Sequence, residues 1–399
     1  MPYYIGDVIK DYKRLVIRTP EDFKKTGIDV KLNTSVEAID PEKGSVRLSD
    51  GTTLPYDILV MATGADAVHL GLPGEDMEGV FTLRKLTDAL KIKSFLNGRK
   101  CRKAVIVGAG YIGMEMCEAF RNLDIETQVI DILPRPVLRW DAEFGKLILE
   151  ELGKNHVSFL PETRPLAVEK GKEFALRLVT DKGNLDADLI LIGVGTRSNT
   201  EMARSIGLAL GESGAIKVDA RQRTSREEVY AVGDCCEVFH RVIGKWVYFP
   251  LGDVANKQGR TAGQNIGGST AQFPGVVGAQ SFKLFNLEAA ATGLTEEEAL
   301  KHGFQPVSTI IQGLPVGRPM AKGEKLGLKL IADKATGKLL GAQSVAEKGA
   351  VMRINSLSVA LFAGLTLDEV GYLDLAYAPP FGGAWDAIHI AAQTLARKL

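Results

Sequence analysis

The spacing of hydrophobic and polar residues changes along the chain, and its clearest stretch predicts alternating strands and helices. Residues 104–120 (AVIVGAGYIGMEMCEAF) combine a short apolar run, a glycine-rich turn and an amphipathic segment. A second strand is predicted over 126–131 (ETQVID), an amphipathic helix over 141–155 (DAEFGKLILEELGKN) and a third strand over 156–160 (HVSFL). Strands and helices in this order predict a parallel, doubly wound α/β sheet.

The flanking segments follow other patterns. Residues 19–27 (TPEDFKKTG) have the start and stop signals of a short helix, and residues 28–40 alternate like a strand. Asp50-Gly51 lies between alternating runs, which is typical of a hairpin. Beyond residue 270 the pattern predicts antiparallel strands and two helices, at 277–293, 325–345, 349–364 and 384–399. No internal repeat is evident.

Composition excludes several classes of function. Lys plus Arg and Asp plus Glu both number 49, so a zero net charge gives no support for binding to nucleic acid or a membrane. Four cysteines in a chain of 399 residues do not make a disulfide framework, and the five histidines show no metal-binding spacing. With no apolar run of transmembrane length and no signal-peptide pattern, the sequence predicts a cytoplasmic protein.

The sharpest motif is the glycine-rich turn Gly108-Ala-Gly110-Tyr-Ile-Gly113, which follows a predicted strand and opens a helix. Gly108 permits a tight turn, Gly110 lets a pyrophosphate approach the backbone, and Gly113 lets helix and strand pack closely. Asp131 ends the next strand, 18 residues after Gly113, where its carboxylate can accept hydrogen bonds from a ribose diol. Ile112 completes the motif as a predicted cofactor-binding residue. The motif therefore predicts a dinucleotide site.

The acid at position 131 favours NAD, because a 2′-phosphate would face a carboxylate. Arg135 and Arg139 lie just downstream and leave NADP open as the alternative.

Three further motifs surround this unit in a specific order: YDILVMATGAD (56–66), LILIGVGTRSNTEMA (189–203) and TSREEVYAVGDCCEV (224–238). With them, the whole chain resembles the FAD-dependent pyridine nucleotide–disulfide oxidoreductases, in the branch of coenzyme A disulfide reductases, NADH oxidases and persulfide reductases. The resemblance implies an α/β fold with two dinucleotide-binding domains and a C-terminal α+β dimerisation domain. It implies four segments: residues 1–98 and 209–270 for FAD, 99–208 for NAD(P), and 271–399 for dimerisation.

The resemblance also assigns roles to individual residues. It implies that the ATG turn passes the flavin, that an acid after a glycine holds the ribityl chain, and that one helix begins at the flavin ring. These residues are Ala62, Thr63, Gly64, Gly233, Asp234, Gly252 and Ala255. In the nicotinamide-binding part it implies an aromatic gate over the flavin, a recurrent acid and a second glycine turn. These are Tyr111, Glu115 and Gly195.

The implied reaction passes a hydride from NAD(P)H to FAD and then electrons to a small-molecule thiol or disulfide, a persulfide or O₂, in a homodimer. Tyr377 matches a tyrosine that reaches the partner subunit's active site, although an interface-packing role is an equal alternative. The stretch GLPVGRPMAKGEKL (313–326) departs from the branch's tyrosine-bearing pattern and puts a match to NADH oxidases or coenzyme A disulfide reductases in doubt. Cys235-Cys236 is interpreted as a buried structural pair in preference to a redox pair.

The opening MPYYIG matches the residues that follow the family's redox cysteine, and the chain has one GxGxxG motif instead of two. The expectation is therefore an N-terminally shortened chain, without the first FAD βαβ unit and the redox cysteine. Two alternatives stay open: a separate polypeptide supplies that unit, or the chain is a non-catalytic dimeric NAD(H)-binding protein or assembly subunit.

Overall fold

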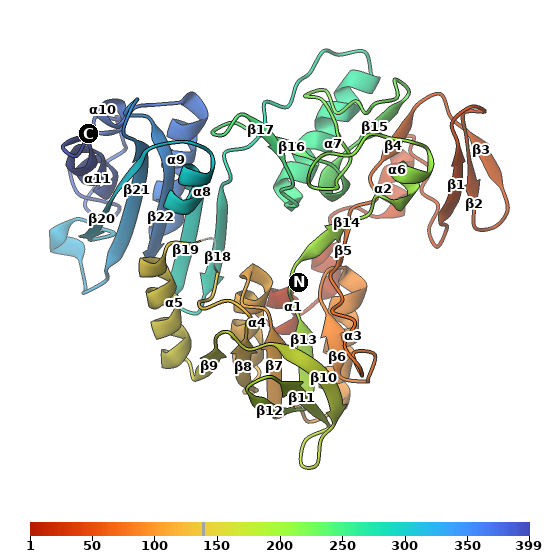
Figure 1. The fold of residues 1–399 in the computed structure, drawn as a ribbon, viewed down its shortest axis with the longest axis horizontal. Helices are drawn as coiled ribbons and strands as arrows, with labels where there is room; N and C mark the ends of the chain where they lie inside the picture. Colours follow the sequence, from red (N-terminus) through yellow and green to blue (C-terminus); the bar gives the residue numbers. More distant parts are fainter. Residues whose placement is uncertain (138–139) are drawn as a thin grey trace. The chain divides into compact units, whose positions relative to one another are not determined.

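The computed structural model describes residues 1–137 and 140–399 and separates into two compact units (Figure 1). Each unit is built from segments that are distant in the sequence. Unit 1 comprises Met1–Lys10, Ala67–Gly195 and Val277–Leu399, and unit 2 comprises Asp11–Asp66 and Thr196–Val276. No helix in the described part of the chain is both long and apolar enough to cross a bilayer.

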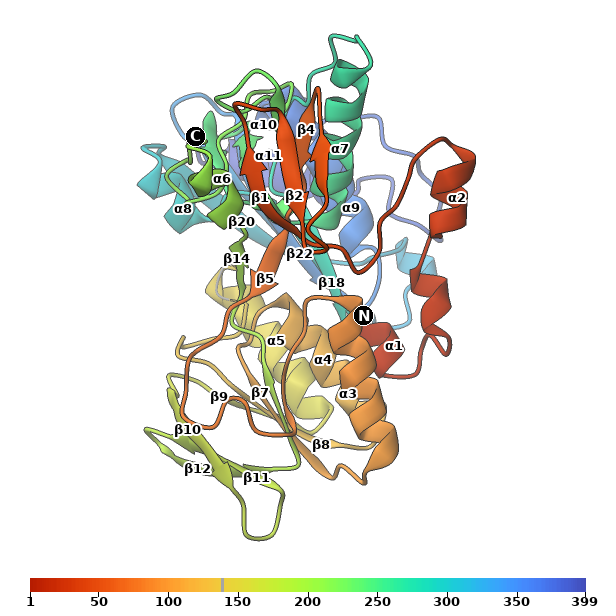
Figure 2. The ribbon, with the colours of Figure 1, turned by 90° about the vertical axis from the view of Figure 1, so that its right-hand side faces the viewer.

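The first element of unit 1 is a five-stranded parallel sheet, in the order β6-β13-β7-β8-β9. Its strands are β6 (Val80–Thr82), β7 (Lys103–Val107), β8 (Glu126–Ile130), β9 (Val157–Leu160) and β13 (Leu189–Ile192). Three helices pack on it: α3 (Leu86–Gly98), α4 (Tyr111–Arg121) and α5 (Ala142–Lys154). A meander on the sheet's other side consists of β10 (Pro165–Lys170), β11 (Leu176–Thr180) and β12 (Gly183–Ala187) (Figure 2). The predicted parallel α/β sheet is confirmed, but the expected double winding is not, because a β-meander instead of helices covers the sheet's second face.

The second element of unit 1 is a five-stranded antiparallel sheet, in the order β18-β19-β22-β21-β20. Its strands are β18 (Gln280–Leu284), β19 (Leu287–Gly293), β20 (Pro306–Gly313), β21 (Leu326–Asp333) and β22 (Leu339–Ala346). The helices around it are α8 (Glu296–Lys301), α9 (Ala350–Ala363), α10 (Leu367–Val370) and α11 (Ala387–Ala396), with the 3₁₀ turn η3 (Arg318–Met320). Every residue of β21 and β22 is buried, because neighbouring elements cover both faces of these central strands.

The opening residues form a short helix, α1 (Pro2–Ile5), that packs against α3 and α4. The buried Lys93 holds it there: its Nζ donates to the Ile5 carbonyl at 3.0 Å and pairs with Asp7 at 2.9 Å.

Unit 2 contains a meander, a two-stranded parallel sheet and a long helix. The strands are β1 (Val36–Asp40), β2 (Ser45–Leu48), β3 (Thr53–Pro55), β4 (Leu59–Met61), β5 (Ala65–Ala67, whose last residue belongs to unit 1), β14 (Thr196–Ser198), β15 (Val229–Ala231), β16 (Val238–His240) and β17 (Lys245–Val247). The helices are α2 (Pro20–Lys25), α6 (Glu201–Ser205) and α7 (Gly252–Ile266), with the 3₁₀ turns η1 (Tyr12–Leu15) and η2 (Gly233–Cys235).

In unit 2 the predicted helix and hairpin are confirmed, whereas one predicted strand was too long. Thr19 caps α2 in a reciprocal capping box with Asp22, and the hairpin joins β2 to β3 around Asp50-Gly51. The strand predicted over 28–40 is present only at Val36–Asp40. The preceding alternation does not form a strand, since those residues have no β-partner among the described strands.

A repeat that the sequence does not reveal appears in the topology. In unit 1 the meander β10-β11-β12 leads directly into the parallel strand β13, and in unit 2 the meander β1-β2-β3 leads into the parallel strand β4. Each parallel strand is followed within three residues by a glycine of positive φ, Gly64 (+67°) and Gly195 (+119°).

Candidate functional site

The glycine-rich turn lies between β7 and α4, and its glycines are required for three different reasons. Gly108 has φ +107°, and an added Cβ would lie 2.5 Å from the Gly193 carbonyl oxygen. A Cβ on Gly113 would lie 2.1 Å from the Gly108 carbonyl oxygen, so helix and strand could not approach as they do. Gly110 has open space where its Cβ would be, which is the vacancy a ligand needs to reach the backbone. The turn therefore fits a pyrophosphate.

Helix α4 places the backbone N–H groups of its first turn beside that space. Its first intrahelical bond runs from the Met114 N–H to the Gly110 carbonyl at 2.9 Å, and Gly110 supplies no capping side chain. The N–H groups of Ile112 and Gly113 precede this ladder, and the helix dipole adds partial positive charge there. An anionic phosphate suits this position.

Asp131 follows β8, the strand next to β7. Its carboxylate accepts the Ala109 N–H at 2.7 Å and the Leu133 N–H at 3.0 Å, so it ties the acid-bearing loop to the glycine turn. Each oxygen keeps a second lone pair for a ribose hydroxyl. The predicted role in ribose binding remains a prediction, as does the preference for NAD.

The two arginines do not settle that preference. Arg135 donates from Nε (3.3 Å) and Nη2 (3.2 Å) to the Trp140 carbonyl, while Arg139 lies outside the described residues.

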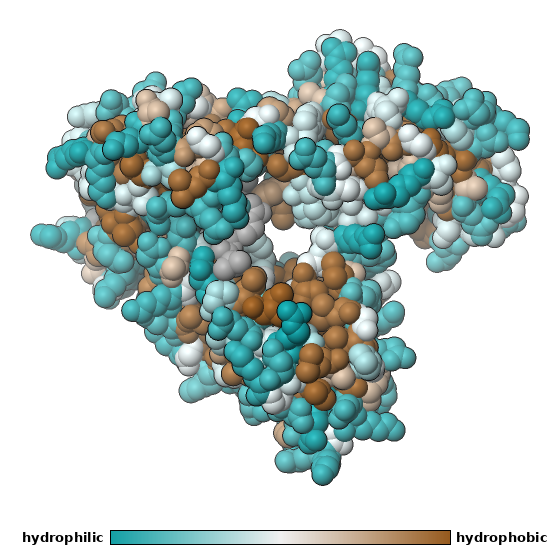
Figure 3. Space-filling model, viewed as in Figure 1, coloured by the Kyte–Doolittle hydropathy of each residue, from teal (hydrophilic) through white to brown (hydrophobic). Residues whose placement is uncertain are grey.

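The second glycine turn follows β13, beside the first. The Gly193 N–H donates to the Val107 carbonyl at 2.7 Å, and the Gly195 carbonyl accepts the Val68 N–H at 3.0 Å. Exposed hydrophobic side chains follow the ends of two strands here, Ile132 after β8 and Val194 after β13. Figure 3 shows hydrophobic surface on this part of unit 1. Such surface is suited to flat heterocycles.

Tyr111 is held by an aromatic cluster. The Trp140 indole N–H donates to the Tyr111 hydroxyl oxygen at 3.1 Å. Phe282 of β18 makes edge-to-face contacts with both rings, at centroid distances of 5.2 Å to Tyr111 and 5.7 Å to Trp140. The predicted gate residue Tyr111 is partly exposed, and it is held by contacts to the buried side chains of Trp140 and Phe282.

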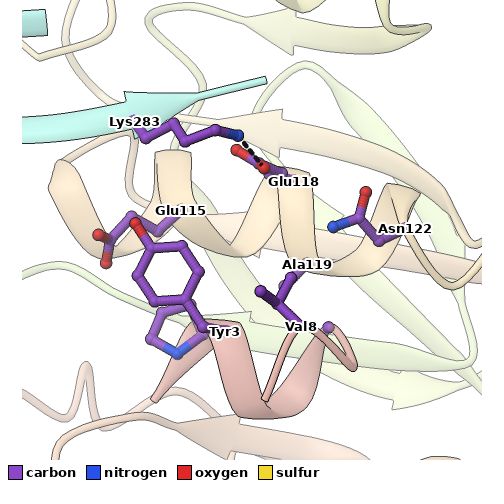
Figure 4. Close-up of a pocket in the computed structure, with 9 residues that line it drawn as sticks. Tyr3, Val8, Glu115, Glu118, Ala119, Asn122 and Lys283 are labelled. Carbon is purple, nitrogen blue, oxygen red and sulfur yellow. Dashed lines mark hydrogen bonds and ion pairs between the residues drawn. The ribbon is translucent and has the colours of Figure 1, made fainter. Parts of the chain in front are cut away.

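Glu115 lies on the side of α4 that faces α1, close to Tyr3 (Figure 4). Burial raises the pKa of its carboxyl group, the N-terminal ammonium opposes this shift and Glu118 adds to it. Glu118 is paired with Lys283, and its carboxylate also accepts the Phe285 N–H at 2.8 Å. The cofactor role predicted for Glu115 stays untested.

In unit 2, the parallel strands β4 and β15 bring two predicted turns to one edge. Met61 pairs with Ala231, and the Val232 N–H donates to the Met61 carbonyl at 3.0 Å. The turn Ala62-Thr63-Gly64 therefore starts beside the turn that carries Gly233 and Asp234. Both glycines have positive φ, +67° at Gly64 and +78° at Gly233.

Asn199 fixes the first of these turns. Its side-chain amide donates to the Thr63 carbonyl at 3.1 Å, its N–H donates to the Gly64 carbonyl at 3.0 Å, and its carbonyl accepts the Thr63 hydroxyl at 2.6 Å. This residue was missed by the sequence reasoning, although it lies in the GTRSN stretch that carried the resemblance.

Gln258 of α7 fixes the second turn. Its buried amide accepts the Gly233 N–H at 3.0 Å and donates to the Glu237 carbonyl at 3.0 Å. A Cβ on Gly233 would lie 3.4 Å from Cβ of Ala255, so turn and helix are in close contact. Helix α7 starts at Gly252 without a side-chain cap and with open space at the glycine, which leaves its first N–H groups for a ligand. These features fit a flavin nucleotide.

The four cysteines are free, and Cys235 and Cys236 are buried. The Cys235 thiol lies 3.4 Å from the Met61 carbonyl oxygen, and the Cys236 thiol lies 3.3 Å from that of Gly233. A hydrogen bond from Cys236, with others from Thr63 and Gly64, lowers the pKa of Cys235 to about 6, against the effect of burial. The hydrogen bond between the two thiols, together with burial, raises the pKa of Cys236.

Tyr377 lies in the loop between α10 and α11 and is 57% exposed. An exposed tyrosine suits either alternative, contact with a partner's active site or interface packing.

Comparisons with known proteins identify the family. Residues 4–259 match the pyridine nucleotide-disulphide oxidoreductase model, and residues 279–388 match the dimerisation domain of the same family. The chain belongs to the pyridine nucleotide-disulphide oxidoreductases. The predicted family, fold class and enzyme class are confirmed, and with them the dependence on FAD and NAD(P)H. The division into four segments stays a prediction.

Three relatives show how far the similarity extends. An NAD(P)H sulfur oxidoreductase (CoA-dependent) of Pyrococcus abyssi is 37% identical, over 98% of this chain and 88% of the relative. An NADH oxidase of Methanocaldococcus jannaschii is 31% identical, over 100% of this chain and 90% of the relative. The solved NAD-dependent persulfide reductase of A. fulgidus superimposes with a TM-score of 0.95 at 37% identity, over 100% of this chain and 75% of that protein.

Proposed function

We propose that this oxidoreductase takes a hydride from NAD(P)H onto FAD and passes electrons to a persulfide or polysulfide, with disulfides and O₂ as alternative acceptors. The observation that carries the proposal is the Gly108–Gly113 turn, which leaves open space at Gly110 beside the start of α4, where no side chain caps the helix. Relatives that are 37% identical are named for sulfur and persulfide chemistry, which favours these acceptors over O₂.

The nucleotide NAD(P)H is held by residues of unit 1. In the proposal, Gly110 and the start of α4 bind the pyrophosphate, Asp131 accepts from the ribose diol, and the carboxylate at Asp131 favours NAD over NADP. The turn at Gly195 borders the nicotinamide half, and Tyr111 controls access of the nicotinamide. The proposal keeps residues 99–208 as the nicotinamide nucleotide segment, of which residues 99–195 lie in unit 1.

The flavin is held by residues of unit 2, from the predicted segments 1–98 and 209–270. Asp234 binds the ribityl chain, Thr63 and Gly64 line the path of the cofactor, and the start of α7 at Gly252 stabilises negative charge on the reduced ring. When bound, FAD supplies the two-electron chemistry that no amino-acid side chain provides. The protein binds and orients the flavin, and the dipole of α7 sets the electrostatic environment of its ring.

A homodimer through residues 271–399 completes the proposal. Helix α9 carries exposed apolar side chains at Met352, Val359 and Phe362, and Val359 is 70% exposed. Exposed apolar positions spaced along one helix suit a subunit interface. Tyr377 would then serve the partner subunit's site. A cytoplasmic location remains part of the proposal.

An absorbance scan of the purified full chain, followed by NADH oxidation with each acceptor, tests the proposal. We expect a yellow protein with flavin bands and NADH turnover that is faster with a polysulfide than with coenzyme A disulfide or O₂. A chain that stays colourless after incubation with FAD, yet binds NADH, would establish the non-catalytic alternative instead. A flavoprotein that reduces only O₂ would reject the sulfur acceptor.

A further inference from the structure

We propose that Trp140 is the positioning residue of Tyr111 and thereby sets the cost of admitting the nicotinamide. The inference rests on the proposed role of Tyr111 as the gate of this oxidoreductase. It assigns a function to a residue outside every sequence motif described above.

The contact is directed at the tip of the Tyr111 ring. The indole Nε1–H of Trp140 donates to the phenol oxygen at 3.1 Å, so the bond acts at the atom that a swing of the ring moves farthest. Phe282 packs edge-to-face against both rings and closes the third side of the cluster. The ring of Tyr111 itself is half-buried, whereas Trp140 is only 1% exposed.

Trp140 is fixed by its backbone, which makes it a rigid anchor. Its N–H donates to the Val137 carbonyl at 2.8 Å, and its carbonyl accepts the Arg135 guanidinium. Its indole also packs edge-to-face on Phe144 of α5, with centroids 6.2 Å apart.

The residue after Trp140 is fixed as well. The Asp141 N–H donates to Oε1 of Gln343 at 3.0 Å, and Nε2 of Gln343 donates to the Asp141 carboxylate at 3.0 Å. Lys329 Nζ lies 3.1 Å from the same carboxylate. With the backbone of Trp140 and the following residue Asp141 both held, movement of Tyr111 breaks the hydrogen bond, because the tryptophan does not follow.

The location of Tyr111 connects this bond to the nicotinamide. Tyr111 is the first residue of α4, directly after Gly110, whose open backbone receives the pyrophosphate in the proposed function. The nicotinamide half of a bound nucleotide displaces the ring, whereas the adenosine and pyrophosphate halves do not. Loss of one such hydrogen bond should change affinity about fivefold, the equivalent of about 1 kcal/mol.

The test compares two ligands that differ in the nicotinamide. Dissociation constants for NAD⁺ and for ADP-ribose are measured by calorimetry on the full chain with FAD supplied. The ratio of the two constants cancels effects on the adenosine and pyrophosphate contacts. Trp140→Phe and Tyr111→Phe each remove the same bond from opposite sides, and Tyr111→Ala removes the gate. Trp246→Phe, an indole replacement in unit 2, is the matched control.

We expect Trp140→Phe and Tyr111→Phe each to lower the NAD⁺ to ADP-ribose ratio about fivefold, with no further change in the double variant. Trp246→Phe should leave the ratio unchanged. If Trp140→Phe lowers the ratio equally in the Tyr111→Phe background, Trp140 acts by another route and the inference is wrong. An unchanged or raised ratio in Trp140→Phe also overturns it.

Two results separate this inference from the proposed function. If Tyr111→Ala lowers the ratio but Trp140→Phe does not, the gate stands and the anchoring role fails. If Tyr111→Ala leaves the ratio unchanged, the gate itself fails, and the inference with it. Because Tyr111→Phe keeps the ring and its packing, it decides the matter even if Trp140→Phe does not fold.

Discussion

Replacing Lys329 with methionine should destabilise unit 1 in a way that depends on pH. Lys329 of β21 has a side chain only 4% exposed, and its Nζ contacts three carboxylates. The distances are 3.1 Å to Asp141, 3.2 Å to Glu143 and 2.6 Å to Glu296. Methionine keeps most of the apolar volume but removes the charge, so the three carboxylates face one another without a cation.

The size of the effect follows from burial. Removing one partner of a buried pair costs about 3–5 kcal/mol, whereas exposed pairs contribute about 0–1 kcal/mol. Asp141 is 14% exposed, but Glu143 and Glu296 are 48% and 39% exposed and can turn towards water. We therefore expect a loss of about 3 kcal/mol at pH 7, the low end of the buried range.

The pH dependence follows from the pKa shifts of the cluster. Burial opposes the charge on Lys329, but its bonds to Glu296 and Asp141 outweigh burial and raise its pKa. Burial likewise opposes ionisation of Glu296, but hydrogen bonds from Lys329 and Ser308 lower its pKa. The stability that the Lys329–Glu296 pair contributes is therefore complete between pH 4.5 and pH 10.5, the ordinary pKa values of the two groups. It is lost as pH falls through the lowered pKa of Glu296.

Asp141 acts in the opposite sense. Burial raises the pKa of Asp141 although Lys329 lies beside it. Its contribution to stability is therefore complete below pH 3.8, the ordinary pKa, and is lost as pH rises through the raised pKa. The cost of Lys329→Met should thus be largest near neutral pH and shrink on acidification.

Urea unfolding followed by tryptophan fluorescence measures the effect, with Trp140 adjacent to Asp141 as a local reporter. Lys283→Met is the control, because its partner is Glu118 but its own side chain is 51% exposed, and it should cost about 1 kcal/mol or less. Adding Asp141→Asn to Lys329→Met should restore part of the loss, since it removes one uncompensated carboxylate while the asparagine oxygen can still accept from Nε2 of Gln343. A loss no larger than that of Lys283→Met, or one that is the same at pH 4 and pH 7, would refute the reasoning.

Three further predictions concern the turn, a buried pair and a partly buried acid. Gly113→Ala should lower both stability and NADH affinity, because the new Cβ would lie 2.1 Å from the Gly108 carbonyl oxygen. Gly110→Ala should fold normally and lose only NADH affinity, because its Cβ has open space. Thermal melts and NADH titrations of the two variants separate these effects. Arg353→Met should cost about 3–5 kcal/mol in urea unfolding, since the 1%-exposed guanidinium makes a bidentate pair with Asp386. Burial raises the pKa of Glu115, so ionisation there costs stability as pH rises through that value, and Glu115→Gln should stabilise the protein at pH 7 but not at pH 4 in parallel melts.

The parts of the fold that the sequence predicts well are those with local signals. The β7–α4 turn, the capping box at Thr19 and the hairpin at Asp50-Gly51 each depend on residues within a few positions of one another. The strand predicted over 28–40 was too long, because alternation alone does not supply a partner strand. The domain segments rest on resemblance, whereas the compact units follow contacts between distant segments.

The supporting residues of the site could not be predicted, since their partners are far away in the sequence. Asn199 holds Thr63 across 136 positions, and Gln343 holds Asp141 across 202. Neither residue type is unusual where it stands, and no spacing rule connects such distances. Trp140 belongs to none of the sequence motifs, and its hydrogen bond to Tyr111 is what distinguishes it.

The repeated topology gives the two glycine turns a common physical explanation. In both units a meander is followed along the chain by a strand of a parallel sheet. After that strand the chain must turn so that its backbone N–H and C=O groups stay available to a ligand. A glycine with positive φ allows this exit, as Gly64 and Gly195 both show. The sequence presents ATG and GVG as unrelated motifs, but the structure shows the same strand-to-turn arrangement used twice. The proposed roles of Gly64 and Gly195 therefore share one physical basis, and substitutions with alanine should impair flavin binding at Gly64 and nicotinamide nucleotide binding at Gly195.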